Sequence, residues 1–113
     1  MPSLPGQPSI IAFVSQTGNV MKTTLAAALG VALGEAGIPT LAVDLDKEHR
    51  ALGASLATWA ADRASNHPDR VQLDVLPAET ADEALQLARS SGRQIVVIDC
   101  PSRATAATAH IAA

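Results

Sequence analysis

The residues best suited to do chemistry lie in one short stretch near the N-terminus, residues 15–24, which reads S-Q-T-G-N-V-M-K-T-T. This stretch follows an apolar run, Ile10 to Val14, and opens a long segment rich in alanine and leucine. A strand, a loop of small residues ending in Lys-Thr-Thr and then a helix is the arrangement of a phosphate-binding loop. In such a loop, backbone N–H groups surround a phosphate and the helix adds the positive end of its dipole. The stretch therefore predicts a phosphate site that includes Lys22 and Thr23.

This loop departs from the G-x-x-x-x-G-K-[ST] pattern at both of its glycines. Gln16 stands at the first glycine position, and Met21 stands directly before the lysine. The loop alone is therefore a weak indication of nucleotide binding, and other residues of the chain must support it.

Three aspartates follow predicted strands, where such support is expected. Asp44 and Asp99 each end an apolar run, and Asp46 follows two residues after Asp44. Ligands of open α/β sheets bind outside the carboxyl ends of the strands. Mg²⁺ is usually held there by carboxylates, waters and phosphate oxygens. A single aspartate at a strand end is also a common turn residue, but three of them beside Lys-Thr-Thr favour a site for a nucleotide and Mg²⁺.

The elements that must position these residues alternate along the chain. Apolar runs predict strands at residues 10–14, 40–44, 71–76 and 95–99. Helical spacing predicts helices at about 23–36, 50–64, 80–91 and 105–113. This alternation indicates an α/β fold with a parallel sheet. Residues 1–9 contain three prolines and are expected to be a disordered lead-in to one domain that covers residues 10–113.

Two of these elements carry more detailed expectations. In the first helix, the apolar face is expected to consist of Leu25, Leu29, Ala32 and Leu33. The helix that follows Thr80 begins with a capping box, in which the side chains of Thr80 and Glu83 satisfy each other's backbone N–H groups.

Composition narrows the class of protein. Hydrophobic residues make up 48% of the 113 residues but aromatic residues only 2%, so small aliphatic side chains must form the core. The net charge is −3 and no basic cluster is present, so nucleic-acid binding by this chain alone is not expected. The single cysteine, Cys100, excludes an internal disulfide and fits a reducing compartment. No secretory signal or bilayer-length apolar run is found, which predicts a cytoplasmic protein without a membrane partner.

Taken in order, the motifs resemble those of the ParA/MinD family of deviant Walker-type ATPases, in particular the short plasmid-partition ParA proteins. Residues 17–24, T-G-N-V-M-K-T-T, stand where that family has K-G-G-V-G-K-T-T. V-D-L-D at 43–46 is similar to the family's second motif, and A-T-W-A at 57–60 to the segment that follows it. L-P-A-E-T at 76–80 and V-I-D-C-P-S-R at 97–103 resemble later family segments. The similarity covers nearly all of the chain from Ile10 onward.

The resemblance implies a P-loop NTPase-like sheet of about four strands in the order 3-2-4-1 with helices on both faces, and ATP and Mg²⁺ as cofactors. It implies that Lys22 holds the β- and γ-phosphates and that Asp46 orients the attacking water. Thr23 would ligate Mg²⁺, with Asp44 supporting the metal shell and Asp99 acting through water. The cofactor-binding loop would comprise Thr17, Gly18, Asn19, Val20, Met21, Lys22, Thr23 and Thr24.

Several positions depart from the family pattern. Thr17 replaces the signature lysine, which in the family reaches a partner's phosphate across a dimer, and Asn19 and Met21 replace glycines. A positive φ at Met21 would cost roughly 1–3 kcal/mol. Lys47-Glu48 replaces the family's Pro-Gln after Asp46. The family fold also has further strands after the V-I-D segment, so a C-terminally truncated copy with a degenerate loop is expected.

These observations favour a ParA-like ATP-binding protein related to plasmid or chromosome partitioning, with weak or absent ATP hydrolysis. Its expected partner is a second copy or another ATPase of the family. The alternative is a non-catalytic interaction module that pairs with a full-length ATPase or another partner, a reading that Thr17 and Met21 favour. A ligase or kinase of the same nucleotide-binding class is a third possibility, against which the A-T-W-A and L-P-A-E-T segments argue.

Overall fold

The structure is a computed structural model that describes residues 7–14, 20–46, 53 and 55–101. Strands and helices alternate, as the sequence predicts. The described elements, in chain order, are β1 (Ser9–Phe13), α1 (Val20–Glu35), β2 (Thr40–Asp44), α3 (Leu56–Asn66), β3 (Val75–Pro77), α4 (Ala81–Ser90) and β4 (Ile95–Asp99). All strand pairs are parallel, in the order β1-β4-β2-β3. Read from the other edge, this is the predicted order 3-2-4-1.

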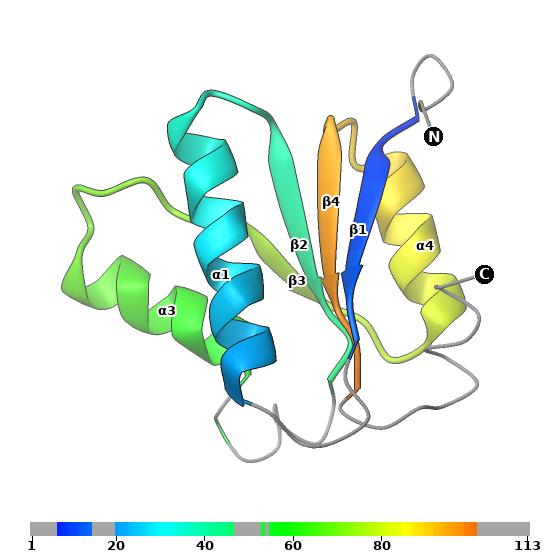
Figure 1. The fold of residues 1–113 in the computed structure, drawn as a ribbon, viewed down its shortest axis with the longest axis horizontal. Coiled ribbons are helices and arrows are strands. Elements are labelled where there is room, and N and C mark those ends of the chain that lie inside the picture. The colour runs from blue at the N-terminus through cyan, green and yellow to red at the C-terminus, as the bar shows by residue number, and fades with distance from the viewer. Residues whose placement is uncertain (1–6, 15–19, 47–52, 54, 102–113) are drawn as a thin grey trace.

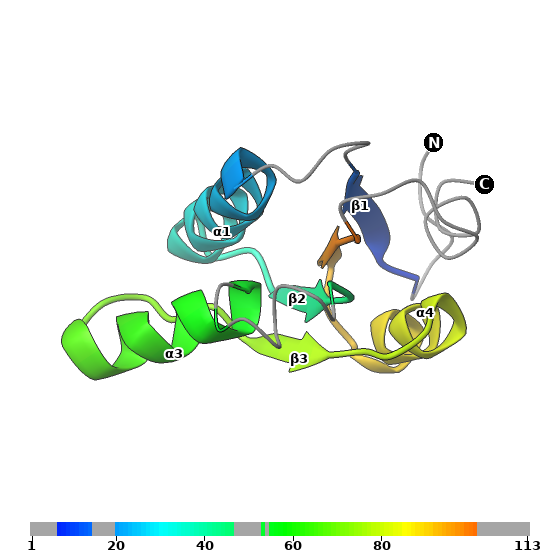
Figure 2. The ribbon, with the colours of Figure 1, turned by 90° about the horizontal axis from the view of Figure 1, so that it is seen from below.

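Helices cover both faces of the sheet, which confirms the predicted layering. Figures 1 and 2 show α1 and α3 on one face and α4 on the other. Each βαβ connection thus places a helix over parallel strands, as connections of this kind require. No helix in the described ranges is long and apolar enough to cross a bilayer.

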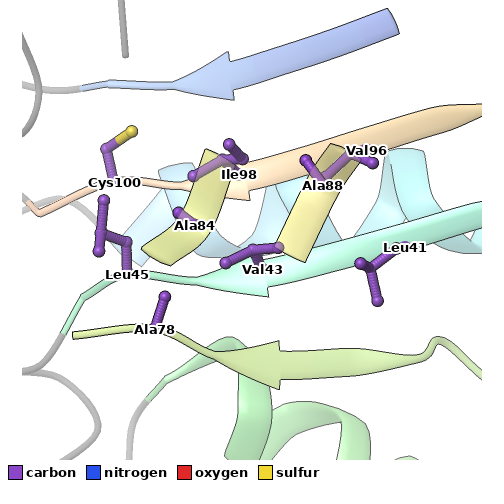
Figure 3. Close-up of a cluster of buried hydrophobic side chains, with 9 residues drawn as sticks. All are labelled: Leu41, Val43, Leu45, Ala78, Ala84, Ala88, Val96, Ile98 and Cys100. Atoms are coloured by element: carbon purple, nitrogen blue, oxygen red, sulfur yellow. The ribbon is translucent and has the colours of Figure 1, made fainter. Parts of the chain in front are cut away.

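The core consists of small aliphatic side chains on either side of the two central strands. β2 is buried along its whole length, and β4 is buried from Val96 onward, as expected of parallel strands covered on both faces. Successive residues face opposite layers. Figure 3 shows the layer beneath α4, with Cys100 and Leu45 at the end toward which the strands point. The opposite layer joins Ala42 and Val97 to a second set of buried residues, Ala26, Ala27, Leu56 and Leu73.

The buried face of α1 differs from the predicted one. Leu25 is 52% exposed, whereas Ala26 and Ala27 are buried. A β-carbon added to Gly30 would lie 2.6 Å from the Cδ1 atom of Leu73, so the helix backbone packs very closely here. Close approach selects the smallest side chains here. The prediction was therefore wrong for Leu25 and for Ala32, which are exposed, whereas Leu29 and Leu33 pack against the core as predicted.

The third strand is shorter than predicted, because β3 begins only at Val75 and not at residue 71. The preceding segment has other partners. The carbonyl of Val71 accepts a hydrogen bond from Arg63 Nε, and the Gln72 amide donates to the carbonyls of His67 and Arg70. Only the end of the predicted strand 71–76 therefore pairs with β2.

Other boundaries shift by smaller amounts. β1 starts at Ser9, inside the predicted lead-in, and the Ser9 N–H donates to the carbonyl of Gln94. Helix α3 begins at Leu56, and the predicted helix at 105–113 lies outside the described residues. Thr80 caps α4 as predicted by accepting the Glu83 N–H at 3.1 Å. The Glu83 carboxylate accepts an N–H from Glu79, the residue before the cap, instead of completing the predicted exchange with Thr80.

Candidate nucleotide site

The parallel register brings the predicted site residues to one edge of the sheet. Asp99 at the end of β4 pairs with Phe13 of β1 on one side and with Asp44 of β2 on the other. The loop after β1 leads into α1, whose first turn carries Lys22 and Thr23. The sheet topology therefore assembles the lysine, the threonine and the aspartates from segments far apart in the sequence.

Lys22 lies at the centre of this assembly. Its Nζ atom is 2.9 Å from Asp99 Oδ1 and 3.4 Å from Asp46 Oδ2, and it donates a hydrogen bond to the carbonyl of Cys100. Only 5% of Lys22 is exposed. The ammonium group is thus held in the protein interior by two carboxylates and a strand-end carbonyl.

Asp99 divides its two oxygens between Lys22 and Thr23. The Thr23 hydroxyl donates to Asp99 Oδ2 at 2.9 Å. The contact between Lys22 and Oδ1 is an ion pair whose angles do not meet hydrogen-bond geometry, so no donor among the described residues is aligned with this buried oxygen. Burial raises the pKa of Asp99, although the Lys22 ammonium and the Thr23 hydroxyl both oppose the rise. The carboxylate retains acceptor capacity toward a further electropositive group.

Asp44 has different surroundings. It is fully buried; its Oδ1 atom accepts the N–H of Asp46 at 3.0 Å and its Oδ2 atom accepts the N–H of Ala57 at 3.2 Å. Ala57 is the second residue of α3. Asp44 therefore contacts both the residue that carries the second site carboxylate and the start of a helix.

Mg²⁺ fits the residues present. Among the residues that the structure describes, no group of three or more histidine, cysteine or acidic residues is arranged to hold a metal by itself. Mg²⁺ is nevertheless commonly bound through one or two carboxylates together with substrate phosphates. Within the described part of the chain, Asp44, Asp46 and Asp99 are buried and Lys22 is the one buried cation. A divalent cation that arrives with phosphates would offset this excess of buried negative charge.

The thiol of Cys100 adds no reactive group to this edge. Cys100 is fully buried in the layer beneath α4, and burial raises the pKa of its thiol to about 11. The thiol is therefore protonated at neutral pH and packs as a small apolar side chain.

The remaining predicted loop residues are only partly described. Thr17, Gly18 and Asn19 lie outside the described residues. Val20 and Met21 form the start of α1, and no described non-glycine residue has a positive φ, so the strain expected at Met21 does not arise. Thr24 is exposed in the same turn.

Sequence reasoning missed the groups that orient these side chains. The Cys100 carbonyl and the Ala57 N–H are backbone groups, and every residue type except proline can supply both kinds, so the sequence does not reveal them. Ser55 is the exception, because it caps α3 by accepting the Thr58 N–H and directly precedes Leu56, the buried first residue of the helix. A serine in that place is a recognisable helix start.

Comparison with known proteins agrees with the fold. The family model described as the CobQ/CobB/MinD/ParA nucleotide binding domain matches residues 11–112. No curated protein matches the chain at a significant level. The family match includes every described residue of the site, the last three residues of β1 and the whole of β2, β3 and β4. The chain belongs to the CobQ/CobB/MinD/ParA nucleotide-binding domain family.

Proposed function

We propose that the protein is a ParA-like ATP-binding protein that takes its nucleotide together with Mg²⁺ at the carboxyl edge of the sheet. The observation that carries this proposal is the buried cluster in which Lys22 contacts Asp99 and Asp46 and in which Thr23 contacts Asp99. These are the residue types that phosphate and Mg²⁺ binding require, and they come from three separate elements of the fold.

Each residue has a proposed role in the complex. Lys22 would bind the β- and γ-phosphates, for which its ammonium must leave at least part of its present contact with the carboxylates. Thr23 would ligate Mg²⁺ and Asp99 would hold the metal through water. The bound metal ion would supply neutralisation of phosphate charge, which is a large part of phosphoryl-transfer catalysis. Asp46, whose carboxylate lies beside Lys22, would orient the attacking water.

We infer that ATP hydrolysis is slow or absent. Thr17 stands where the ParA/MinD pattern has a lysine, and a missing cationic donor at developing negative charge is costly to a reaction rate. A role in plasmid or chromosome partitioning, as a dimer or beside another ATPase of the family, is the accompanying proposal. It is supported by the resemblance of residues 17–24, 43–46 and 76–80 to that group.

Calorimetric titration of Mg·ATP tests the proposal directly. We expect binding by the wild-type chain and at least tenfold weaker binding by Lys22→Ala and Thr23→Ala, each first shown to be folded by circular dichroism. Arg89→Ala, which changes an exposed cation at the end of α4, should bind as the wild type does. Absence of binding at millimolar nucleotide, or equal binding by folded Lys22→Ala, would refute the proposed function.

A non-catalytic interaction module is the second candidate, and the exposed surface of β1 favours it. Ile10 and Ile11 of this edge strand are 39% and 36% exposed. A hydrophobic edge strand is a ready site for pairing with another chain. Under this reading the chain pairs with a partner ATPase, and the titration described above gives no heat with Mg·ATP.

A further inference from the structure

We propose that Asp44 is a positioning residue that ties Asp46 to the first turn of α3, and that it is not part of the Mg²⁺ shell. The inference rests on the proposed function for the role of Asp46, whereas the tie itself is a property of the chain without nucleotide. It assigns to Asp44 a different task from that of Asp99, although both aspartates end buried neighbouring strands.

The two oxygens of Asp44 are each directed at a backbone N–H group. Oδ1 accepts from Asp46 at 3.0 Å and Oδ2 accepts from Ala57 at 3.2 Å. The side chain is fully buried. A metal ion at Asp44 would have to share a carboxylate oxygen with one of these hydrogen bonds, because each oxygen already accepts one N–H group. Asp99 Oδ1, in contrast, has no aligned hydrogen-bond donor among the described residues.

The residue type suits this task. An ionised carboxylate accepts at both oxygens, whereas an asparagine has only one acceptor oxygen and would turn donor hydrogens toward the second N–H. The first N–H groups of a helix lack partners inside the helix. In α3, Ser55 Oγ accepts from Thr58 and Asp44 accepts from Ala57, so the cap is shared between the helix's own residue and the end of β2.

Through Asp44, a change at the nucleotide site should affect the first turn of α3. The Asp46 carboxylate lies 3.4 Å from the Lys22 ammonium, and the Asp46 N–H is bonded to Asp44. When phosphates engage Lys22, the contact between Lys22 and Asp46 must change. Because one carboxylate holds both Asp46 and Ala57, we expect the first turn of α3 to respond to that change.

Amide hydrogen exchange measured by NMR tests the tie in the chain without nucleotide. In Asp44→Asn we expect exchange at both Asp46 and Ala57 to rise at least tenfold. Ala57→Pro tests the same tie by removing the N–H donor in the first turn of α3, while the Asp44 carboxylate stays in place. We expect it to raise exchange at Asp46 at least threefold. Ser55→Ala is the matched control, which should raise exchange at Thr58 and leave Asp46 unchanged.

Mg·ATP then separates a positioning role from metal ligation. In the wild type, the nucleotide should change exchange at Ala57 and Thr58 at least threefold. In Asp44→Asn this response should be lost, while the Mg²⁺ concentration for half-maximal ATP binding stays within threefold of the wild-type value. A tenfold or larger rise in that concentration, with exchange at α3 unaltered, would identify Asp44 as a metal ligand and overturn the proposal.

The two proposals fail in different ways. If the wild type does not bind Mg·ATP, the proposed function fails, and exchange in the chain without nucleotide still decides the tie. If Asp44→Asn does not fold, Ala57→Pro and Ser55→Ala still decide it. Unchanged exchange at Asp46 in Ala57→Pro would show that the two N–H groups are held independently, which would also overturn the proposal.

Discussion

Replacing Lys22 by methionine should destabilise the protein even without nucleotide. Methionine retains much of the length of the lysine side chain but removes its charge. In the structure the ammonium contacts Asp99 and Asp46, and all three side chains are buried. The substitution therefore leaves two carboxylates without their common cation. The lysine that is proposed to bind phosphate is thus also needed to hold this edge of the sheet together.

The size of the effect follows from burial. Removing one partner of a buried ion pair typically costs about 3–5 kcal/mol. Burial raises the pKa of Asp99, so protonation of this carboxyl would relieve part of the cost, and we expect about 3 kcal/mol at neutral pH. A domain of this size has a total free energy of unfolding of about 5–15 kcal/mol. Each kcal/mol should lower the melting temperature by roughly 4 °C, so a fall of about 12 °C is expected.

Urea unfolding followed by circular dichroism measures this free energy. Arg89→Met is the control, because it removes an exposed cation and should stay within about 0.5 kcal/mol of the wild type. The double variant Lys22→Met/Asp99→Asn should lose less than the sum of its single changes, since it removes both charges of one pair. A Lys22→Met variant as stable as Arg89→Met at pH 7 would refute the reasoning.

Two further predictions concern packing and pH. Gly30→Ala should destabilise the protein by about 1 kcal/mol, because the added β-carbon would lie 2.6 Å from the buried Leu73. Gly34→Ala should be neutral or stabilising, because its β-carbon would lie 3.0 Å from the exposed Val71, whose side chain can move. Urea unfolding of both variants measures the difference. Because the pKa of Asp99 is raised from 3.8, the folded chain binds this proton more tightly than the unfolded chain. The stabilising contribution of Asp99 is therefore full below the unfolded pKa and lost as the pH rises through the folded pKa. The stability of the wild type relative to Asp99→Asn should thus fall as the pH is raised from about 4 toward neutrality. An unchanged difference across this range would contradict the raised pKa.

Strand number and direction could be predicted from the alternation of apolar runs with helical segments, whereas the strand order was predicted from the family resemblance. The apolar runs at 40–44 and 95–99 are covered on both faces, as their lack of alternation indicates. The face of α1 could not be predicted in the same way. Hydrophobic spacing gives weight to Leu25, but the contact with the sheet selects for small volume and buries Ala26 and Ala27. Periodicity placed Leu29 and Leu33 correctly against this layer, but it does not report the side-chain size that decided the positions in closest contact.

The sequence predicted which side chains form the candidate site, but not the hydrogen bonds that connect them. Parallel strands that end at one edge explain why Asp44 and Asp99 meet, and this follows from the fold class alone. The partners of Asp44 are backbone N–H groups, which any residue supplies, so its distinct role could not be inferred from its type or spacing. Two aspartates that look equivalent in the sequence differ in the structure because their neighbours differ.

The buried charges also set what ATP binding requires. In the chain without nucleotide, the positive charge of Lys22 is already engaged by Asp99 and Asp46, so phosphates must compete with carboxylates for the same ammonium. Exchanging one ionic contact for another gains little, and unaccompanied phosphates would add negative charge beside three buried aspartates. Mg²⁺ makes ATP binding more favourable, because the ion binds phosphate oxygens and carboxylate groups at the same time. The proposed affinity for ATP must therefore depend strongly on Mg²⁺, and the acidic strand ends, more than the lysine, set that dependence.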